Sequence, residues 1–130
     1  MAITISIQDT SGLKVSNRID VQFYSDVVTV KDIIQARVEQ EVADYNSEKP
    51  EYFKGLVQPG DAEKTLNGYK VKARKAIDAE KQVYIALDAF GKNAYFVLID
   101  NKQVESLDQQ VQISENLSIK FVKLTPLVGG

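Results

Sequence analysis

The sequence predicts a single α+β domain, a roll in which a main helix packs across a mixed sheet and a second helix is inserted. Three observations support this class. Apolar and polar residues alternate over residues 3–8, which is the period of a half-buried strand. Apolar residues recur at helical spacing over residues 30–45, and alternation returns over residues 117–122. A hairpin, a helix and a final strand in this order favour a helix lying on one face of the sheet.

The first two strands are expected to form a hairpin. Alternation recurs over residues 19–24, whereas residues 9–12 have the composition of a turn and residues 13–17 are predicted to be a loose connection. Thr29 and Asp32 approximate a capping box, which predicts that the main helix begins at residue 30. Pro50 lacks a backbone donor and disfavours helical angles at the residue before it, so the helix is expected to end near residue 45.

An insertion and a second helix are predicted next. Between about residues 48 and 77, glycine and proline recur among scattered apolar residues, which indicates an irregular insertion with a short strand or helix over residues 69–75. Asp78 can cap a helix over about residues 79–90, and Gly91 suits the left-handed position after its last turn.

The last third of the domain is predicted to return to the sheet. Residues 95–99 are five consecutive apolar residues, which is typical of a strand buried on both faces. A short irregular crossover leads to a last strand that ends near Leu124. The crossover is expected to be held in the core by Leu107, Val111 and Ile113. We therefore expect one domain over residues 1–124, followed by a flexible tail over residues 125–130.

The composition limits the functions that are available. The chain has 130 residues with 16 Lys and Arg against 18 Asp and Glu, and a formal net charge of −2 disfavours a dedicated nucleic-acid binder. It has no His and no Cys, so we expect no metal site, no bound cofactor and no catalytic residues. The carboxylate pairs Asp61 with Glu63 and Glu39 with Glu41 are interpreted as solvated surface charges. Without a basic leader or a long apolar segment, a cytoplasmic protein with no membrane contact, monomeric when alone, is expected.

The tail carries the main functional signal. After the last strand the chain reads Leu124, Thr125, Pro126, Leu127, Val128, Gly129 and Gly130. Pro126 cannot continue a strand's hydrogen bonding from an interior position, so the tail is expected to leave the sheet there. Because Gly129 and Gly130 have no Cβ, this end can pass through a narrow channel and adopt backbone angles closed to other residues.

These features resemble the ubiquitin-like β-grasp superfamily. Residues 100–130 are similar to the C-terminal third of the small subunit of molybdopterin synthase and related sulfur carriers. The similar features are the Asp100-Asn101-Lys102-Gln103 turn, Leu107-Asp108, the turn at Glu115-Asn116, the strand through Phe121, and a proline four residues before the terminal glycine. The opening strands and the helix from Val30 are similar to ubiquitin in order and spacing. Compact family members have a far shorter connection in place of residues 48–93.

The resemblance implies that the protein is a substrate rather than an enzyme. An E1-like adenylating enzyme would use ATP to convert the carboxylate of Gly130 into a mixed anhydride, which is a good acyl donor. Leu124, Pro126, Leu127 and Val128 would then fill pockets of that enzyme. We expect a protein modifier that is conjugated to a target, because the insertion offers extra surface to receptors. The alternatives are a sulfur carrier with a C-terminal thiocarboxylate, which the tail sequence favours, and a β-grasp interaction module that is never activated.

One basic cluster stands out within the insertion. Lys70, Lys72, Arg74 and Lys75 follow one another in the segment YKVKARK, and their ordinary interpretation is a solvated face. If functional, they would form a docking patch for an acidic partner surface and act mainly on the association rate. In β-grasp proteins the connection between helix and strand returns near the final strand, so the insertion is expected to lie beside the tail.

Overall fold

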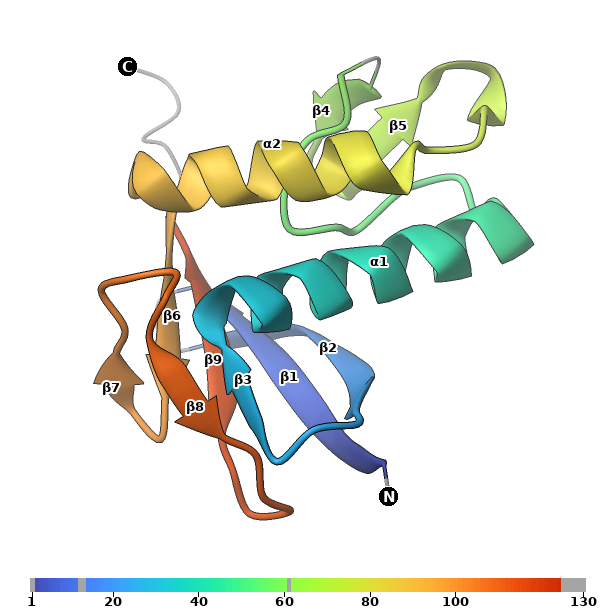
Figure 1. The fold of residues 1–130 in the computed structure, drawn as a ribbon. Coiled ribbons are helices and arrows are strands. Elements are labelled where there is room, and N and C mark those ends of the chain that lie inside the picture. Colours follow the sequence, from blue (N-terminus) through green and yellow to red (C-terminus); the bar gives the residue numbers. More distant parts are fainter. Residues whose placement is uncertain (1, 12–13, 61, 125–130) are drawn as a thin grey trace.

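A mixed five-stranded sheet forms the base of the fold. The computed structural model describes residues 2–11, 14–60 and 62–124, without the side chain of Arg74. The strands in spatial order are β2 (Lys14–Phe23), β1 (Ile3–Ser11), β9 (Ile119–Lys123), β6 (Tyr95–Ile99) and β7 (Lys102–Gln103). β1 and β9 are parallel neighbours, and the other pairs are antiparallel (Figure 1). The α+β class and the mixed sheet predicted from the sequence are confirmed.

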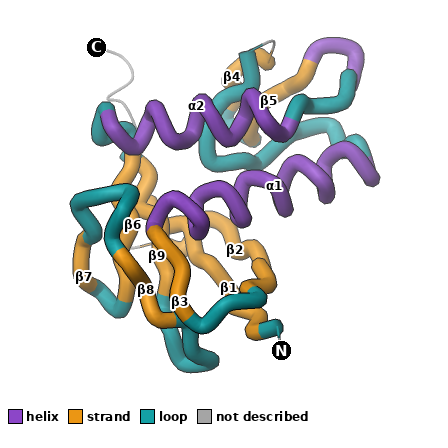
Figure 2. Tube along the Cα trace, viewed as in Figure 1, coloured by secondary structure: helices purple, strands orange, loops and turns teal. Residues whose placement is uncertain are grey.

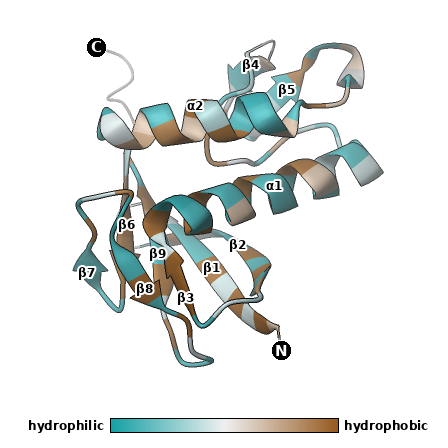
Figure 3. Cartoon of the chain, viewed as in Figure 1, coloured by the Kyte–Doolittle hydropathy of each residue, from teal (hydrophilic) through white to brown (hydrophobic). Residues whose placement is uncertain are grey.

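Helix α1 (Val30–Glu48) lies across one face of this sheet (Figure 1). The expected capping box is present: the Asp32 N–H donates to Thr29 Oγ1 at 3.1 Å, and the Thr29 N–H donates to Asp32 Oδ2 at 3.0 Å. The apolar residues that α1 buries are Val30, Ile33, Ile34, Val38, Val42 and Tyr45. Figure 3 shows apolar and polar residues alternating along the helix and the strands. The helical period read from the sequence therefore identified the buried face of α1.

A second, two-stranded ladder holds the start of α1. β3 (Val27–Thr29) pairs antiparallel with β8 (Gln110–Gln112). The chain just before β8 accepts the first hydrogen bonds of the helix, from the Val30 N–H to Gln109 O and from the Lys31 N–H to Leu107 O, both at 3.0 Å. The first N–H groups of an α-helix have no partner within the helix, so the predicted crossover satisfies donors that would otherwise be open.

The chain between the two helices is structured and contributes to the core. β4 (Ala62–Thr65) and β5 (Gly68–Val71) form a hairpin, and a 3₁₀ turn, η1 (Lys72–Arg74), follows, so a strand and a short helix both occur over residues 69–75 (Figure 2). The buried apolar residues of this segment are Phe53, Leu56, Val57, Val71 and Ile77. Helix α2 (Ala79–Gly91) then packs on α1 and contacts β6.

Two predicted turns differ from the structure. β1 continues through residues 9–11, which were predicted to be a turn, and β2 begins at Lys14 with a register shift opposite Asp9 and Thr10. The strand persists because Asp9 is paired inside the protein rather than hydrogen-bonded to a local turn. Gly91 is the last residue of α2, and the left-handed conformation falls on Asn93, whose φ is 59°.

Two further boundaries are corrected. α1 extends beyond residue 45 to Glu48, and Lys49 ends it in the left-handed region with φ 45°. β6 is not buried on both faces: Tyr95 and Val97 are buried, whereas Phe96 and Leu98 are half-buried. The reason is that the helices cover only one face of the sheet. Within the described residues, neither helix combines the length and the apolar composition needed to cross a bilayer.

Candidate functional site

The predicted reactive tail departs from the centre of the sheet. β9 lies between β1 and β6 and ends at Lys123, and the next residue, Leu124, is 49% exposed. The other predicted tail residues, Pro126, Leu127, Val128, Gly129 and Gly130, lie outside the described residues. We call the end of β9, at Lys123 and Leu124, the tail root.

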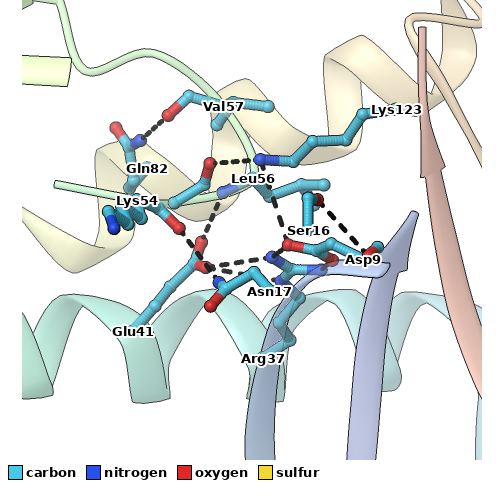
Figure 4. Close-up of polar contacts among 11 residues, drawn as sticks. Asp9, Ser16, Asn17, Arg37, Glu41, Lys54, Leu56, Val57, Gln82 and Lys123 are labelled. Carbon is cyan, nitrogen blue, oxygen red and sulfur yellow. Dashed lines mark hydrogen bonds and ion pairs between the residues drawn. The ribbon is translucent and has the colours of Figure 1, made fainter. Parts of the chain in front are cut away.

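Lys123 belongs to a group of four charged side chains beneath the tail root, which we call the charge cluster: Asp9, Arg37, Glu41 and Lys123 (Figure 4). Arg37 is completely buried, and its two terminal nitrogens donate to the two carboxylate oxygens of Asp9, with 2.7 Å between Nη2 and Oδ2. Its Nη2 also lies 3.3 Å from Glu41 Oε2. Two cations and two carboxylates leave the cluster formally neutral, as charges removed from water require.

The charge cluster holds the insertion against the tail root. Lys123 Nζ donates to Gly55 O at 2.8 Å and lies 3.9 Å from Asp9 Oδ2, while Glu41 Oε1 accepts the Leu56 N–H at 3.0 Å. A Cβ at Gly55 would lie 2.2 Å from the ring of Phe53, so the close approach of this segment requires glycine. The insertion therefore lies beside the root of the tail, an arrangement that the β-grasp resemblance allows.

Burial and pairing have opposite effects on the titration of these groups. Burial raises the pKa of the Glu41 carboxyl, although the charge of Arg37 opposes it. Burial lowers the pKa of Lys123, although the charge of Asp9 opposes it. The pKa of Arg37 is raised, because the charges and hydrogen bonds of Glu41 and Asp9 outweigh the opposing effect of burial. Burial therefore outweighs pairing at Glu41 and Lys123, whereas pairing outweighs burial at Arg37.

The charge cluster was not predicted from the sequence. Glu41 was expected on a solvated face and Asp9 in a turn, whereas Glu41 is 7% exposed and Asp9 is 1% exposed. Glu39 and Glu63 are exposed, as expected, and Asp61 lies outside the described residues. A signal was present in the sequence, because residues 37 and 41 fall on the same helical stripe as Ile34, Val38 and Val42. A charged pair spaced four residues apart on an apolar stripe indicates buried pairing.

The predicted docking patch extends over two hollows, and Lys72 lines both of them. Lys70 lies on β5 opposite Glu63 of β4. Lys72 and Lys75 line a hollow of about 370 Å³ at the start of α2, together with Asp78 and Lys81. The side chain of Arg74 is not described. Ala73, which follows Lys72 in η1, has a left-handed backbone conformation with φ 54°.

Comparison with known proteins gives no match: neither a family model, nor a curated protein, nor a solved structure matches this chain. In the part of the chain that the structure describes, no group of three acidic, His or Cys side chains is placed to hold a metal ion. The geometry of the tail root is therefore the basis for a functional proposal.

Proposed function

We propose that this chain has a β-grasp fold and is a ubiquitin-like protein modifier activated at Gly130. The supporting observation is the sheet order β2-β1-β9-β6-β7, in which the first and last strands are parallel central neighbours and α1 follows the first hairpin. In this order the last strand ends in the middle of the sheet at Lys123, seven residues before Gly130 in the sequence. We expect a Gly-Gly end that follows an anchored central strand to be suited to insertion into a partner.

The activation step is a transfer of the AMP group of ATP to the Gly130 carboxylate. A carboxylate oxygen of Gly130 bonds to the α-phosphorus of ATP, and the bond from that phosphorus to pyrophosphate breaks, which leaves an acyl adenylate. The catalytic groups belong to the E1-like partner. This chain contributes positioning: the charge cluster fixes Lys123, so that the tail starts from a defined place, and exposed Leu124 is available to a pocket of the partner.

The fate of the activated carboxylate defines two forms of the proposal. In the modifier, a thiol of the partner displaces AMP to form a thioester, and an amine of a target protein then displaces the thiolate to form an amide; alternatively the amine displaces AMP directly. In the sulfur carrier, a donor of sulfide-level sulfur, such as hydrosulfide, attacks the acyl carbonyl, AMP leaves, and a thiocarboxylate remains. The segment 49–78 favours the modifier because it adds structured surface beside the tail root. The similarity of residues 100–130 to sulfur carriers favours the second form.

The test combines the purified chain with the adenylating enzymes of its own organism and measures ATP-dependent pyrophosphate release. We expect deletion of Gly130, or Gly129→Ala, to abolish release while the urea midpoint stays unchanged, because residues at a chain terminus usually contribute little to stability. Lys102→Ala, on the exposed turn of β7, is the control and should react normally. Full activity of the Gly130 deletion would disprove activation at this site.

Intact mass distinguishes the two forms and the third alternative. Recovery of the chain covalently attached to larger proteins supports the modifier, whereas replacement of one oxygen by one sulfur in the free chain supports the sulfur carrier. If none of the organism's adenylating enzymes acts on the chain, the non-activated interaction module is the better description.

A further inference from the structure

A groove of about 380 Å³ begins at the tail root and ends at the β4–β5 hairpin. Its charged lining residues are Lys54, Lys64 and Lys123, and the lining that the structure describes contains no carboxylate. Lys123 is held in the charge cluster, whereas Lys54 and Lys64 are exposed. Figure 4 shows Asn17 of β2 and Lys54 beside the cluster, where Asn17 Nδ2 donates to Lys54 O at 3.4 Å. We call this feature the lysine groove.

The register of the hairpin explains why the lysine groove has one sign of charge. Lys64 pairs with Tyr69, and Glu63 pairs with Lys70. Successive side chains of a strand point to opposite faces, so Lys64 and Tyr69 face the groove while Glu63 faces away from it. A separate hollow on the other side, lined by Glu63 and Lys70, agrees with this assignment. The carboxylate nearest in sequence is thereby kept out of the groove.

The tip of the same hairpin presents an apolar residue. Leu66 is fully exposed and contributes to the lining of the groove. The turn that carries it is held by two hydrogen bonds of Thr65: its Oγ1 donates to Gly68 O at 2.6 Å and accepts the Asn67 N–H at 3.2 Å. Tight hairpin turns usually carry polar residues and glycine. This large apolar side chain is not buried by any of the residues that the structure describes.

We infer that the lysine groove and Leu66 form a docking surface for an acidic protein segment, whose carboxylates pair with Lys54 and Lys64 and whose apolar side chains pack on Leu66. The charge of the groove is opposite to that of the chain as a whole, which carries −2. Nucleic acid fits less well, because a phosphate backbone offers nothing apolar to Leu66. The surface adjoins the tail root, so this inference rests on the proposed function and adds to it a binding site for the partner that receives the tail. Binding at this surface does not require activation of Gly130.

The experiment is an NMR titration of the full chain with a synthetic peptide in which glutamates alternate with leucines and phenylalanines. We expect saturable shifts of the amide signals of residues 54–55 and 64–69. The affinity should fall steeply as salt is raised, because exposed charges are screened within about 10 Å at 0.1 M ionic strength. Two control peptides are used: one with lysines in place of the glutamates, and one with the same glutamates but serines in place of the apolar residues. Neither should bind at this surface.

Variants locate the binding surface. The double variant Lys54→Glu/Lys64→Glu should weaken binding of the acidic peptide at least tenfold, and Leu66→Ser should weaken it about fivefold or more without changing its salt dependence. The matched control is Lys31→Glu/Lys102→Glu, which reverses two exposed lysines outside the groove and should change the affinity less than twofold. Unchanged binding by the groove variants overturns the inference, as does the absence of saturable shifts in the groove.

Two further outcomes also contradict the inference. If the shifts fall on residues 70–75 and 81, the acidic segment docks at the other basic surface. If removal of residues 125–130 alone produces the groove shifts, the occupant is the chain's own tail. The Gly130 deletion separates this inference from the proposed function, because it should still bind the peptide while losing activation.

Discussion

Charged side chains near the tail root fall into two groups that differ in burial and pairing. In the charge cluster, Arg37 and Asp9 are at most 1% exposed and are joined to Glu41 and Lys123 by hydrogen bonds or ion pairs. In the lysine groove, Lys54 and Lys64 are exposed, and no ion pair involves them among the described residues. A lysine therefore stabilises the fold in the charge cluster, whereas the exposed lysines of the groove remain available to bind a partner.

The difference shows that a buried charge needs an oppositely charged partner within the protein, whereas an exposed charge can stay unpaired and bind another molecule. Inside the protein each ion must be compensated, so the loss of one member leaves another charge unpaired in a medium that solvates it poorly. At the surface water solvates an unpaired lysine, and its removal costs little. Residues 53–57 lie between the charge cluster and the lysine groove and are hydrogen-bonded to the cluster. Substitutions in and around this segment can therefore test whether buried and exposed charges have different roles.

The largest effect is expected from Asp9→Ala. Removing this carboxylate leaves buried Arg37 with Glu41 alone, and the free energy of unfolding should fall by about 3 to 5 kcal/mol. Urea denaturation measures the change. Lys64→Ala in the lysine groove is the comparison, and its effect should stay within about 0.5 kcal/mol. Equal effects of the two substitutions would remove the distinction between the regions.

Phe53→Ala tests whether the insertion is part of the core. Phe53 is 2% exposed and packs edge-on against Tyr45, with 5.4 Å between the ring centroids. Its truncation should cost about 3 to 5 kcal/mol, similar to Phe121→Ala at the centre of the sheet, because both leave a cavity. Tyr24→Ala is the control, since Tyr24 is 75% exposed and its loss should cost little. A small effect at Phe53 would indicate that residues 53–57 detach without disturbing the domain.

A pair of glycines in the same connection gives a smaller and more local test. In Gly55→Ala the new methyl group would meet the Phe53 ring, and the adjustment should cost about 1 to 3 kcal/mol. Gly60→Ala has no atom within 4 Å of the added Cβ and should change stability by less than about 0.5 kcal/mol. Thermal unfolding of the two variants under the same conditions measures the difference. If Gly55→Ala is as stable as Gly60→Ala, the contact of Gly55 with Phe53 is not close in solution.

The smallest expected effect is a change in pH dependence. Burial raises the pKa of Glu41 above its ordinary value of 4.5, so the folded state retains a proton that the unfolded state has lost as the pH rises past that value. Stability then falls with rising pH until the folded protein is ionised too. Relative to Glu41→Gln, the wild-type chain should therefore lose stability in this window. Urea midpoints measured from below pH 4.5 upward give the difference, and a difference that does not depend on pH would contradict the raised pKa.

How much of the fold could be predicted depended on whether the deciding interactions were local. The start of α1 was predictable because Thr29 and Asp32 bond each other three residues apart. α2 was predictable from helical spacing and its Asp78 cap. The β4–β5 hairpin was missed, although its turn contains Asn67 and Gly68, because its strands are short and carry few apolar residues. Phe53 completes it by backbone bonds to Tyr69 at 2.7 and 2.9 Å, a pairing that no local pattern indicates.

For the candidate site, the sequence named residues but did not place most of them. Gly129 and Gly130 were proposed from their position after the last strand, and they stay a prediction. The basic run from Lys70 to Lys75 stays a predicted docking patch: Lys70 and Lys72 line one hollow, and Lys72 and Lys75 line another. The lysines of the groove come from three separate segments, so no window of sequence contains them together.

The sequence by itself determined the helices, the period of the strands and the expectation of a Gly-Gly tail after a final strand, because each depends on residues close together in the chain. Only the tertiary structure decided which charges are buried. Asp9 and Arg37 are 28 residues apart, and they meet because β1 and α1 pack against each other. Lys123 and Gly55 are 68 residues apart, and they meet because β9 enters the centre of the sheet beneath the insertion. Whether a carboxylate is buried depends on which helices and strands pack over it, and this packing is decided only when the whole chain folds.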